Sequence, residues 1–147
     1  MTKDYIIITM KFHIITIFSH IYDSYFSESI LGRAQKQEAI EIKTHDLRSF
    51  SGNKHRRVDD TPYGGGAGMI LQALPILRAV SSILKRVSGK TKIVIFSAKG
   101  KQLSQKMVYD WAEKCDNIIL ISGRYEGTDE RAKIILKKIA RNASKNV

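Results

Sequence analysis

The sequence predicts an α/β domain with a mostly parallel sheet flanked by helices. Short runs rich in isoleucine, valine and phenylalanine alternate along the chain with longer segments of helical spacing. Such an alternation implies a sheet both of whose faces are covered by helices. The length of 147 residues suits one domain that buries a core without disulfides, and the single cysteine excludes a disulfide within the chain.

The first part of the chain is expected to form strand, helix, strand. Residues 11–18, "KFHIITIF", are β-branched and aromatic without a breaker and predict a buried strand, whereas residues 1–9 are treated as an N-terminal extension. Residues 19–37 predict a helix with Ser19 as N-cap and Gly32 as a stop or kink. Residues 38–46, "EAIEIKTHD", alternate apolar and polar side chains and predict a strand with one face in water.

The alternation resumes after an irregular segment, residues 47–68, which is long enough to indicate a working loop. Residues 71–86 predict a helix with Pro75 in its first turn. A strand at 91–97, a helix at 102–115 and a strand at 117–122 follow. Residues 129–144, "DERAKIILKKIARNAS", predict an amphipathic helix with a basic face.

Charge indicates the kind of partner. The chain has 25 Lys and Arg against 14 Asp and Glu, a formal net charge of +11, which favours salt-sensitive binding of polyanions such as nucleic acid. The apolar runs are too short to span a membrane, so neither a membrane nor a secretory address is expected and the predicted location is cytoplasmic. Four scattered histidines give no support to a zinc site.

Two glycine-containing loops follow predicted strands. "SAKGKQ" (97–102) and "SGRYEGTDER" (122–131) stand where ligands bind in open α/β sheets, beyond the carboxyl ends of the strands. Gly100, Gly123 and Gly127 would let a ligand lie against the backbone, although tight strand-to-helix turns explain single glycines equally well. The many polar residues of the second loop favour a binding site.

The stretch "DDTPYGGGAGM" (59–69) combines acids, proline, an aromatic ring and four glycines. Its spacing fits neither the dinucleotide fingerprint nor a phosphate loop. We therefore expect a loop that passes very close to something bulky or repeatedly adopts positive φ.

The stretches "VDDTPYGGGAGM" (58–69) and "SGRYEGTDER" (122–131) together resemble the paired signature of the bacterial tRNA (guanine-N1)-methyltransferases. "MKFHIITIF", "GRAQKQEAIEI" and "IFSAKG" fit as well, so the resemblance covers residues 10–131. It implies a SPOUT-like, knotted α/β fold and a homodimer. It also implies S-adenosylmethionine as methyl donor and methylation of N1 of the tRNA guanosine just 3′ of the anticodon, with no DNA partner.

The resemblance assigns roles to particular residues. The cofactor would be bound by Ser97, Gly100, Gly123, Arg124, Tyr125 and Gly127. Catalysis would involve Arg124, Glu126 and Asp59, with Glu126 also linked to magnesium. The substrate loop would comprise Asp59, Asp60, Tyr63, Gly64, Gly65 and Gly66. The chemistry agrees, because methyl transfer to N1 needs alignment, a base for the N1 proton and a cation beside the neighbouring oxygen.

The sequence departs from the family pattern after Arg131. We expect one methyltransferase-like domain over residues 1–147, with residues 132–147 as a basic helical tail. The third cofactor loop, the presumed general base and the C-terminal tRNA-binding domain are then absent, and the knot is incomplete. The alternative hypothesis is an inactive basic RNA-binding or dimerising remnant.

Overall fold

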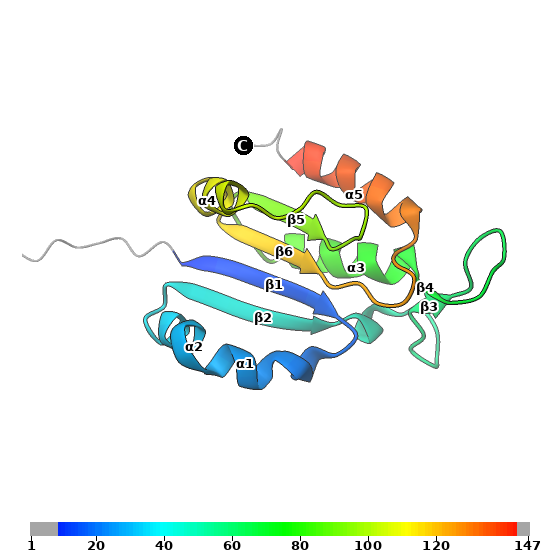
Figure 1. Cartoon of the computed structure of the whole chain (residues 1–147), viewed down its shortest axis with the longest axis horizontal. Helices are drawn as coiled ribbons and strands as arrows, with labels where there is room; N and C mark the ends of the chain where they lie inside the picture. Colours follow the sequence, from blue (N-terminus) through cyan, green and yellow to red (C-terminus); the bar gives the residue numbers. More distant parts are fainter. Residues whose placement is uncertain (1–8, 144–147) are drawn as a thin grey trace, which may run out of the picture.

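A four-stranded parallel sheet forms the centre of the molecule in the computed structural model, which describes residues 9–143 (Figure 1). The strand order is β2-β1-β6-β5, and each neighbouring pair is parallel. The predicted fold class is therefore confirmed; the knot stays a prediction. The strands are β1 (Met10–Thr16), β2 (Ile40–Asp46), β5 (Thr91–Ile95) and β6 (Asn117–Ile121). The proposed extension at residues 1–9 and the end of the basic tail at 144–147 lie outside the described residues, apart from Thr9.

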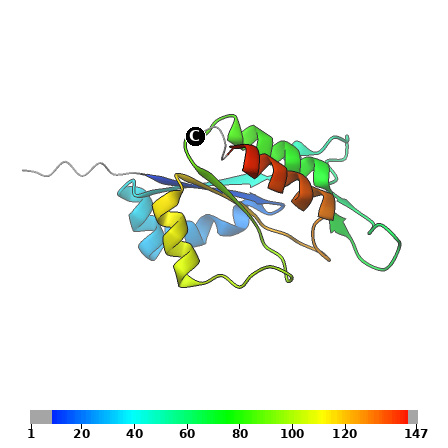
Figure 2. The same cartoon turned by 90° about the horizontal axis from the view of Figure 1, so that it is seen from above.

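Helices cover both faces of the sheet (Figure 2). One face carries α3 and α5, which pack against each other, and the opposite face carries η1, α1, α2 and α4. The short helix η2 follows β2 and packs on α3. The helices are η1 (Ser19–Tyr22), α1 (Asp23–Ser27), α2 (Ser29–Lys36), η2 (Leu47–Phe50), α3 (Ala73–Leu84), α4 (Gln105–Lys114) and α5 (Glu130–Ala143).

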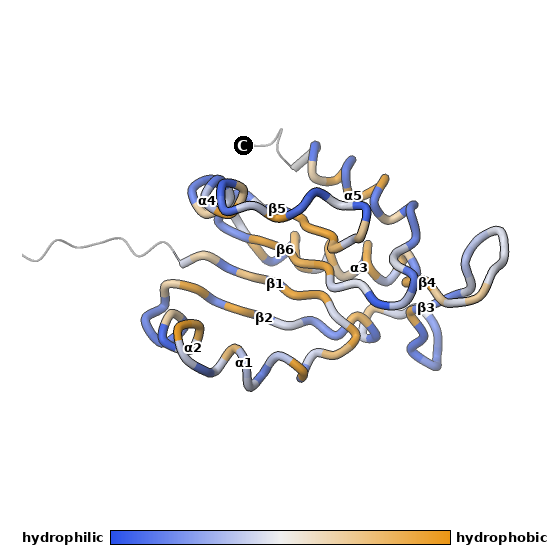
Figure 3. The backbone as a smooth tube through the Cα atoms, viewed as in Figure 1, coloured by the Kyte–Doolittle hydropathy of each residue, from blue (hydrophilic) through white to orange (hydrophobic). Residues whose placement is uncertain are grey.

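The core lies between the sheet and α3. Ile15 of β1 and Ile119 and Ile121 of β6 are fully buried against Ile76 and Val80 of α3. Hydrophobic residues accordingly run along the strands and α3 in Figure 3. Each such side chain contributes roughly 1.5–3 kcal/mol when removed from water, so this layer supplies much of the folding free energy. The opposite layer is thinner, since α1 and α4 contain no buried residue.

The predicted helix at residues 19–37 is divided in a way that the sequence did not indicate. Ser19 is the first residue of η1 and forms no side-chain cap, and the chain breaks at Glu28, which is extended, before Ser29 at φ +50°. Gly32 neither stops nor kinks the helix but lies inside α2. A Cβ on Gly32 would collide with the Ser27 carbonyl oxygen, so this glycine permits the close approach of α2 to the end of α1.

The predicted loop at 47–68 contains more structure than expected. Two short antiparallel strands, β3 (Asp59–Asp60) and β4 (Ile70–Leu71), form a ribbon below the glycine-rich tip. Gln72 holds the base of this ribbon together: the Gln72 backbone N–H donates to the Val58 carbonyl at 2.8 Å, and the Gln72 side chain donates to the Asp59 carbonyl at 3.0 Å.

No helix among the described residues has the length and apolarity to cross a membrane.

Candidate active site

The loops after β5 and β6 lie side by side at the carboxyl edge of the sheet. Ile95 and Ile121 are register partners, and the Phe96 N–H donates to the Ile121 carbonyl at 3.3 Å, which extends the ladder into the loops. Beyond this point the loops enclose a pocket of about 580 Å³, within the usual size range of small-ligand sites. We call it the strand-end pocket; it is lined by Phe96, Ser97, Ala98, Lys99, Gly123, Arg124, Tyr125, Glu126, Gly127, Thr128, Glu130 and Lys133.

The glycines of these loops differ in role. At Gly123 an added Cβ would meet the Phe96 carbonyl oxygen at 3.6 Å, an ordinary contact, so the missing side chain leaves room in the pocket. Gly127 has φ +126°, a conformation that other residues rarely adopt. Gly100 does not line the strand-end pocket. It lines an adjacent groove of about 480 Å³, which shares Ser97 with the pocket.

The glycine-rich loop has the repeated positive φ that the sequence indicated. Gly64, Gly65 and Gly66 have φ values of +93°, +82° and +117°, and an added Cβ at any of them would point into open space. The close approach is at Gly68 instead, where a Cβ would lie 2.6 Å from the Glu126 side chain. Conformation therefore requires all four glycines, since Gly68 also has φ +106°, and at Gly68 the contact with the Glu126 side chain is a second reason.

The two signature stretches are joined through their backbones. The Glu126 N–H donates to the Met69 carbonyl at 3.0 Å, and the Leu71 N–H donates to the Gly127 carbonyl at 2.9 Å. The Asp129 N–H completes the series by donating to Leu71 at 3.0 Å. The glycine-rich loop is thus attached directly to one wall of the strand-end pocket.

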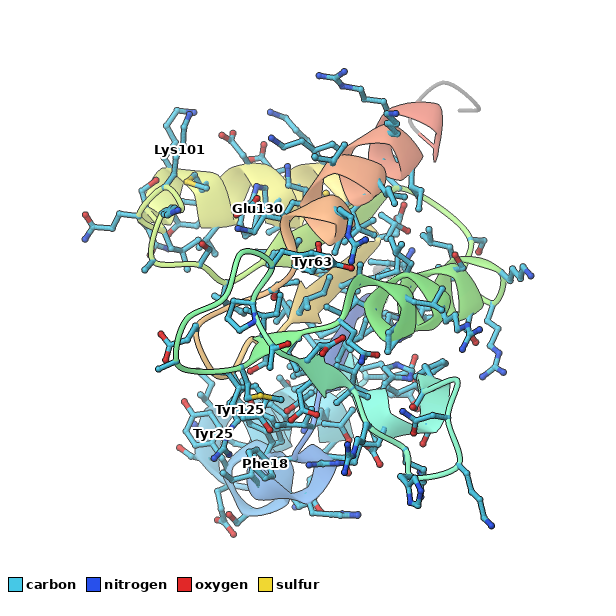
Figure 4. The ribbon with its side chains drawn as sticks, turned by 90° about the vertical axis from the view of Figure 1, so that its right-hand side faces the viewer. Phe18, Tyr25, Tyr63, Lys101, Tyr125 and Glu130 are labelled. Atoms are coloured by element: carbon cyan, nitrogen blue, oxygen red, sulfur yellow. The ribbon has the colours of Figure 1, made fainter. Side chains whose placement is uncertain are left out.

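Tyr125 connects this wall to β3. Its phenol lies beside Asp59, and the interaction with that carboxylate, before the smaller effect of desolvation, raises the pKa of Tyr125. Tyr125 also has φ +62°, an uncommon conformation for a non-glycine residue that often marks functional positions. The Arg124 guanidinium lies over the Phe18 ring at 4.7 Å and over the Tyr125 ring at 5.4 Å. Figure 4 looks onto this edge, with Phe18 and Tyr125 on the same side.

Asp129 and Arg131 form an ion pair that holds the glycine-rich loop. Asp129 is 7% exposed, and Arg131 binds its carboxylate at 2.6 Å while donating to the Tyr63 hydroxyl at 3.0 Å. The hydrogen bond from Arg131 lowers the pKa of Asp129 and raises that of Arg131. Asp60, Tyr63, Asp129 and Arg131 line a separate pocket of about 310 Å³ between this loop and α3.

The predicted site residues therefore fall into four groups. Ser97, Gly123, Arg124, Glu126 and Gly127 line the strand-end pocket together with Tyr125, and Asp59 is linked to them through Tyr125. Gly100 belongs to the adjacent groove. Asp60 and Tyr63 line the pocket beside α3, whereas Gly64, Gly65 and Gly66 form the exposed loop tip.

Sequence reasoning missed several contributors. Phe18, whose ring lies below the Arg124 guanidinium, comes directly after β1. Because ligands bind beyond the carboxyl ends of strands, its position in the sequence was a usable signal. Lys99 and Lys133 line both the pocket and the adjacent groove, and Thr128 lines the pocket. No local signal pointed to Lys133, because only the packing of α5 beside β5 brings it to this edge.

An open parallel sheet with a glycine-walled pocket at its strand ends is the architecture of an α/β protein that binds a small ligand at the carboxyl edge. The family model of the tRNA (guanine-1)-methyltransferase TrmD matches residues 10–144. The chain belongs to this family, as the two signature stretches predicted. The match begins where the sequence resemblance begins and continues past Arg131.

Individual relatives agree with the family match. The chain is 45% identical to the tRNA (guanine-N(1)-)-methyltransferase of Thermomicrobium roseum, over 87% of this chain and 47% of that protein. It is 42% identical to the enzyme of that name from Dictyoglomus turgidum, over 88% of this chain and 51% of that protein. The crystal structure of the tRNA (m1G37) methyltransferase from Aquifex aeolicus superimposes with a TM-score of 0.78 at 38% identity, over 86% of this chain and 56% of that one. The chain thus spans about half the length of the curated relatives it matches.

Proposed function

We propose that the chain forms one methyltransferase-like domain that methylates N1 of guanosine 37 in tRNA with S-adenosylmethionine as donor. Family membership supports the reaction. The observation that carries the proposal is the attachment of the glycine-rich loop to the wall of the strand-end pocket. This attachment joins the first signature to the wall of a ligand-sized hollow that the second signature lines, and a reaction between two bound substrates requires such neighbouring sites.

The strand-end pocket fits a nucleoside-like donor. Gly123 presents backbone without a side chain, and Ser97 and Tyr125 add hydroxyl groups beside it. Backbone and hydroxyl groups of this kind hydrogen-bond the polar edges of adenine and ribose. Bound S-adenosylmethionine would supply an activated methyl group. The chain's own contribution is then to hold donor and acceptor in line and to exclude water.

Arg124 and Asp59 have complementary roles in the proposed reaction. Methylation of guanine forms the N1–methyl bond as the donor's sulfur–methyl bond breaks. A general base accepts the N1 proton, and negative charge develops on the neighbouring oxygen. Arg124, which lines the pocket together with Lys99 and Lys133, is the cation to which we assign the stabilisation of that charge. Asp59 supplies a carboxylate near the glycine-rich loop. It also interacts with Tyr125, so it acts on the pocket wall.

Glu126 lines the pocket beside Gly68, as a residue near the reacting groups would.

The predicted magnesium has less support. Among residues 9–143 there is no group of three or more His, Cys, Asp or Glu side chains that could hold a metal ion. A magnesium ion bound through Glu126 alone would depend on water and substrate oxygens for its remaining ligands. No step of the proposed reaction is therefore assigned to a metal.

The proposed partners are tRNA and a second copy of the chain. Phe18, Ile21, Tyr25 and Ile30 are exposed on the segment from β1 to α2, and Leu103, Val108 and Tyr109 are exposed at α4. Both segments cover the same face of the sheet, the thinly packed one (Figure 2). An extended apolar surface of this kind favours a homodimer. A cytoplasmic location follows from the proposed substrate.

Two measurements test the proposal. Isothermal titration with S-adenosylmethionine tests the strand-end pocket, and transfer of a labelled methyl group to unmodified tRNA tests the reaction. We expect binding that Gly123→Val abolishes, and methylation confined to guanosine 37. Neither binding nor transfer by the folded chain would overturn the proposal and leave the inactive RNA-binding hypothesis.

A further inference from the structure

We propose that the groove between β5 and α5 binds the phosphates of a single-stranded segment of RNA and guides it toward the strand-end pocket. The inference rests on the proposed function only for the identity of that RNA. We call this feature the basic groove and define it by Lys99, Lys133, Lys137 and Arg141. It has a volume of about 480 Å³, and neither Asp nor Glu is among its lining residues.

The positive charges of the basic groove are largely uncompensated. Among the ion pairs of the described residues, only Lys133 of the four participates, with Glu130 at 2.7 Å. The pKa of Glu130 is lowered first by this hydrogen bond and further by the charges of Lys133, Lys99 and Lys137. Lys99, Lys133 and Lys137 therefore all lie close enough to act on the Glu130 carboxylate. The single negative charge of Glu130 does not neutralise these three positive charges.

The arrangement of the cations suits a strand. Lys133, Lys137 and Arg141 recur every four residues along α5, so they form a stripe roughly 12 Å long at about 1.5 Å per residue. Ile93, Ile95 and Leu136 provide an apolar floor below this stripe. A polynucleotide presents one charge per nucleotide, so successive phosphates meet successive cations along the stripe.

A single small phosphate fits this groove less well. A monoester carries roughly −1.5 to −2 charges, which is less than the charge of four cations. The cations also stand on two elements, α5 and the loop after β5, and do not converge on one point. Charge balance therefore favours a polyanion over an isolated phosphate group.

The basic groove leads into the strand-end pocket. Ser97, Lys99 and Lys133 line both hollows, so a strand whose phosphates lie along α5 is brought to the edge of the candidate active site. Lys92, whose ammonium lies 5.6 Å from the Trp111 ring centroid, marks the far end of the groove.

The test compares three proteins by fluorescence polarisation with a labelled, unstructured oligoribonucleotide at several salt concentrations. K137Q/R141Q removes two charges from the basic groove. R33Q/K36Q removes two charges from exposed positions of α2, on the opposite side of the sheet (Figure 1). Each lost phosphate contact lowers the slope of log affinity against log salt by about 0.7, so we expect a reduction of about 1.4 in the groove variant and none in the control.

Equal slopes in the wild type and the groove variant, or equal reductions in both variants, would overturn the proposal. Displacement of the oligoribonucleotide by an equal concentration of inorganic phosphate at constant ionic strength would also overturn it, since the groove would then be a small-anion site. Circular dichroism checks folding, and K99Q, outside any helix, repeats the test if the α5 variant unfolds. Titration with S-adenosylmethionine separates the proposed methyl transfer from the proposed RNA-binding groove. If RNA binding depends on the groove but S-adenosylmethionine does not bind, only the proposed reaction is refuted.

Discussion

The Tyr125 phenol lies beside the Asp59 carboxylate, where the wall of the strand-end pocket meets the base of the glycine-rich loop. The interaction with Asp59 raises the pKa of Tyr125 above its ordinary value of 10.0. Removing the charge of Asp59 must therefore lower that pKa. We expect Asp59→Asn to show an earlier alkaline transition of Tyr125, measured as the tyrosinate absorbance that Tyr125→Phe eliminates.

The same substitution bears on the proposed activity. Because Asp59 acts on Tyr125 in the wall of the strand-end pocket, its neutralisation is expected to slow methyl transfer. The affinity for S-adenosylmethionine is expected to change less, since Asp59 does not line the strand-end pocket. Unchanged transfer by Asp59→Asn would remove Asp59 from the catalytic residues.

Gly123 and Gly127 are expected to respond differently to alanine. Gly123→Ala introduces a Cβ at an ordinary 3.6 Å contact, so the unfolding midpoint changes little while donor affinity falls. Gly127→Ala forces a side chain onto φ +126°, which costs on the order of 1–3 kcal/mol of stability. Thermal unfolding and isothermal titration of both variants check this. A destabilised Gly123→Ala protein would show that this glycine serves the fold instead.

Arg131 is expected to stabilise the glycine-rich loop through Asp129 and Tyr63. Arg131→Ala leaves the buried Asp129 carboxylate without its cation and is expected to lower the urea midpoint of unfolding. Arg141→Ala on the same helix is the matched control, since Arg141 is exposed. Urea unfolding measures the cost, and limited proteolysis within residues 61–68 is expected to accelerate only in Arg131→Ala. Equal stability of the two variants would contradict the role of the pair.

The adjacent histidines of β1 and β2 are expected to make the fold sensitive to acid. His13 Nδ1 lies 3.1 Å from His45 Nε2, and His13 is 6% exposed. Burial is the main cause that lowers the pKa of His13 to about 4, followed by the charges of His45 and Lys43, with Lys11 acting in the same direction and Glu41 opposing them. Burial, then the charges of Arg86 and Lys43, also lowers the pKa of His45.

The direction of the pH effect follows from these shifts. Above pH 6.5 both histidines are neutral in the folded and unfolded chains, so they add no pH dependence. Below 6.5 the unfolded chain binds protons that the folded chain excludes, so stability falls until about pH 4, by up to roughly 3 kcal/mol for His13. Urea unfolding from pH 7 to pH 4 measures this, and His13→Leu is expected to flatten the profile. The same slope in His13→Leu would assign the acid sensitivity to other groups.

The sequence by itself determined the type and order of most elements. The β-branched runs became β1, β5 and β6, and the helical segments became α3, α4 and α5, with Pro75 in the first turn of α3. The spacing of apolar residues is a local property of the sequence. It produces a helix or a strand wherever the apolar side of that element packs against a core. The two signature stretches were also sufficient to identify the family, because their residues are specific without regard to contacts.

The tertiary structure alone decided which distant residues meet. Asp59 lies beside Tyr125. Gly100 lines the basic groove instead of the strand-end pocket, although its loop resembled that of Gly123. Gly32 was interpreted as a helix stop, but it serves the contact with Ser27. A glycine has no side chain that reveals its neighbour, and the strand order that brings β5 beside β6 depends on packing across the whole chain. Those contacts arise from the folded arrangement and not from local sequence.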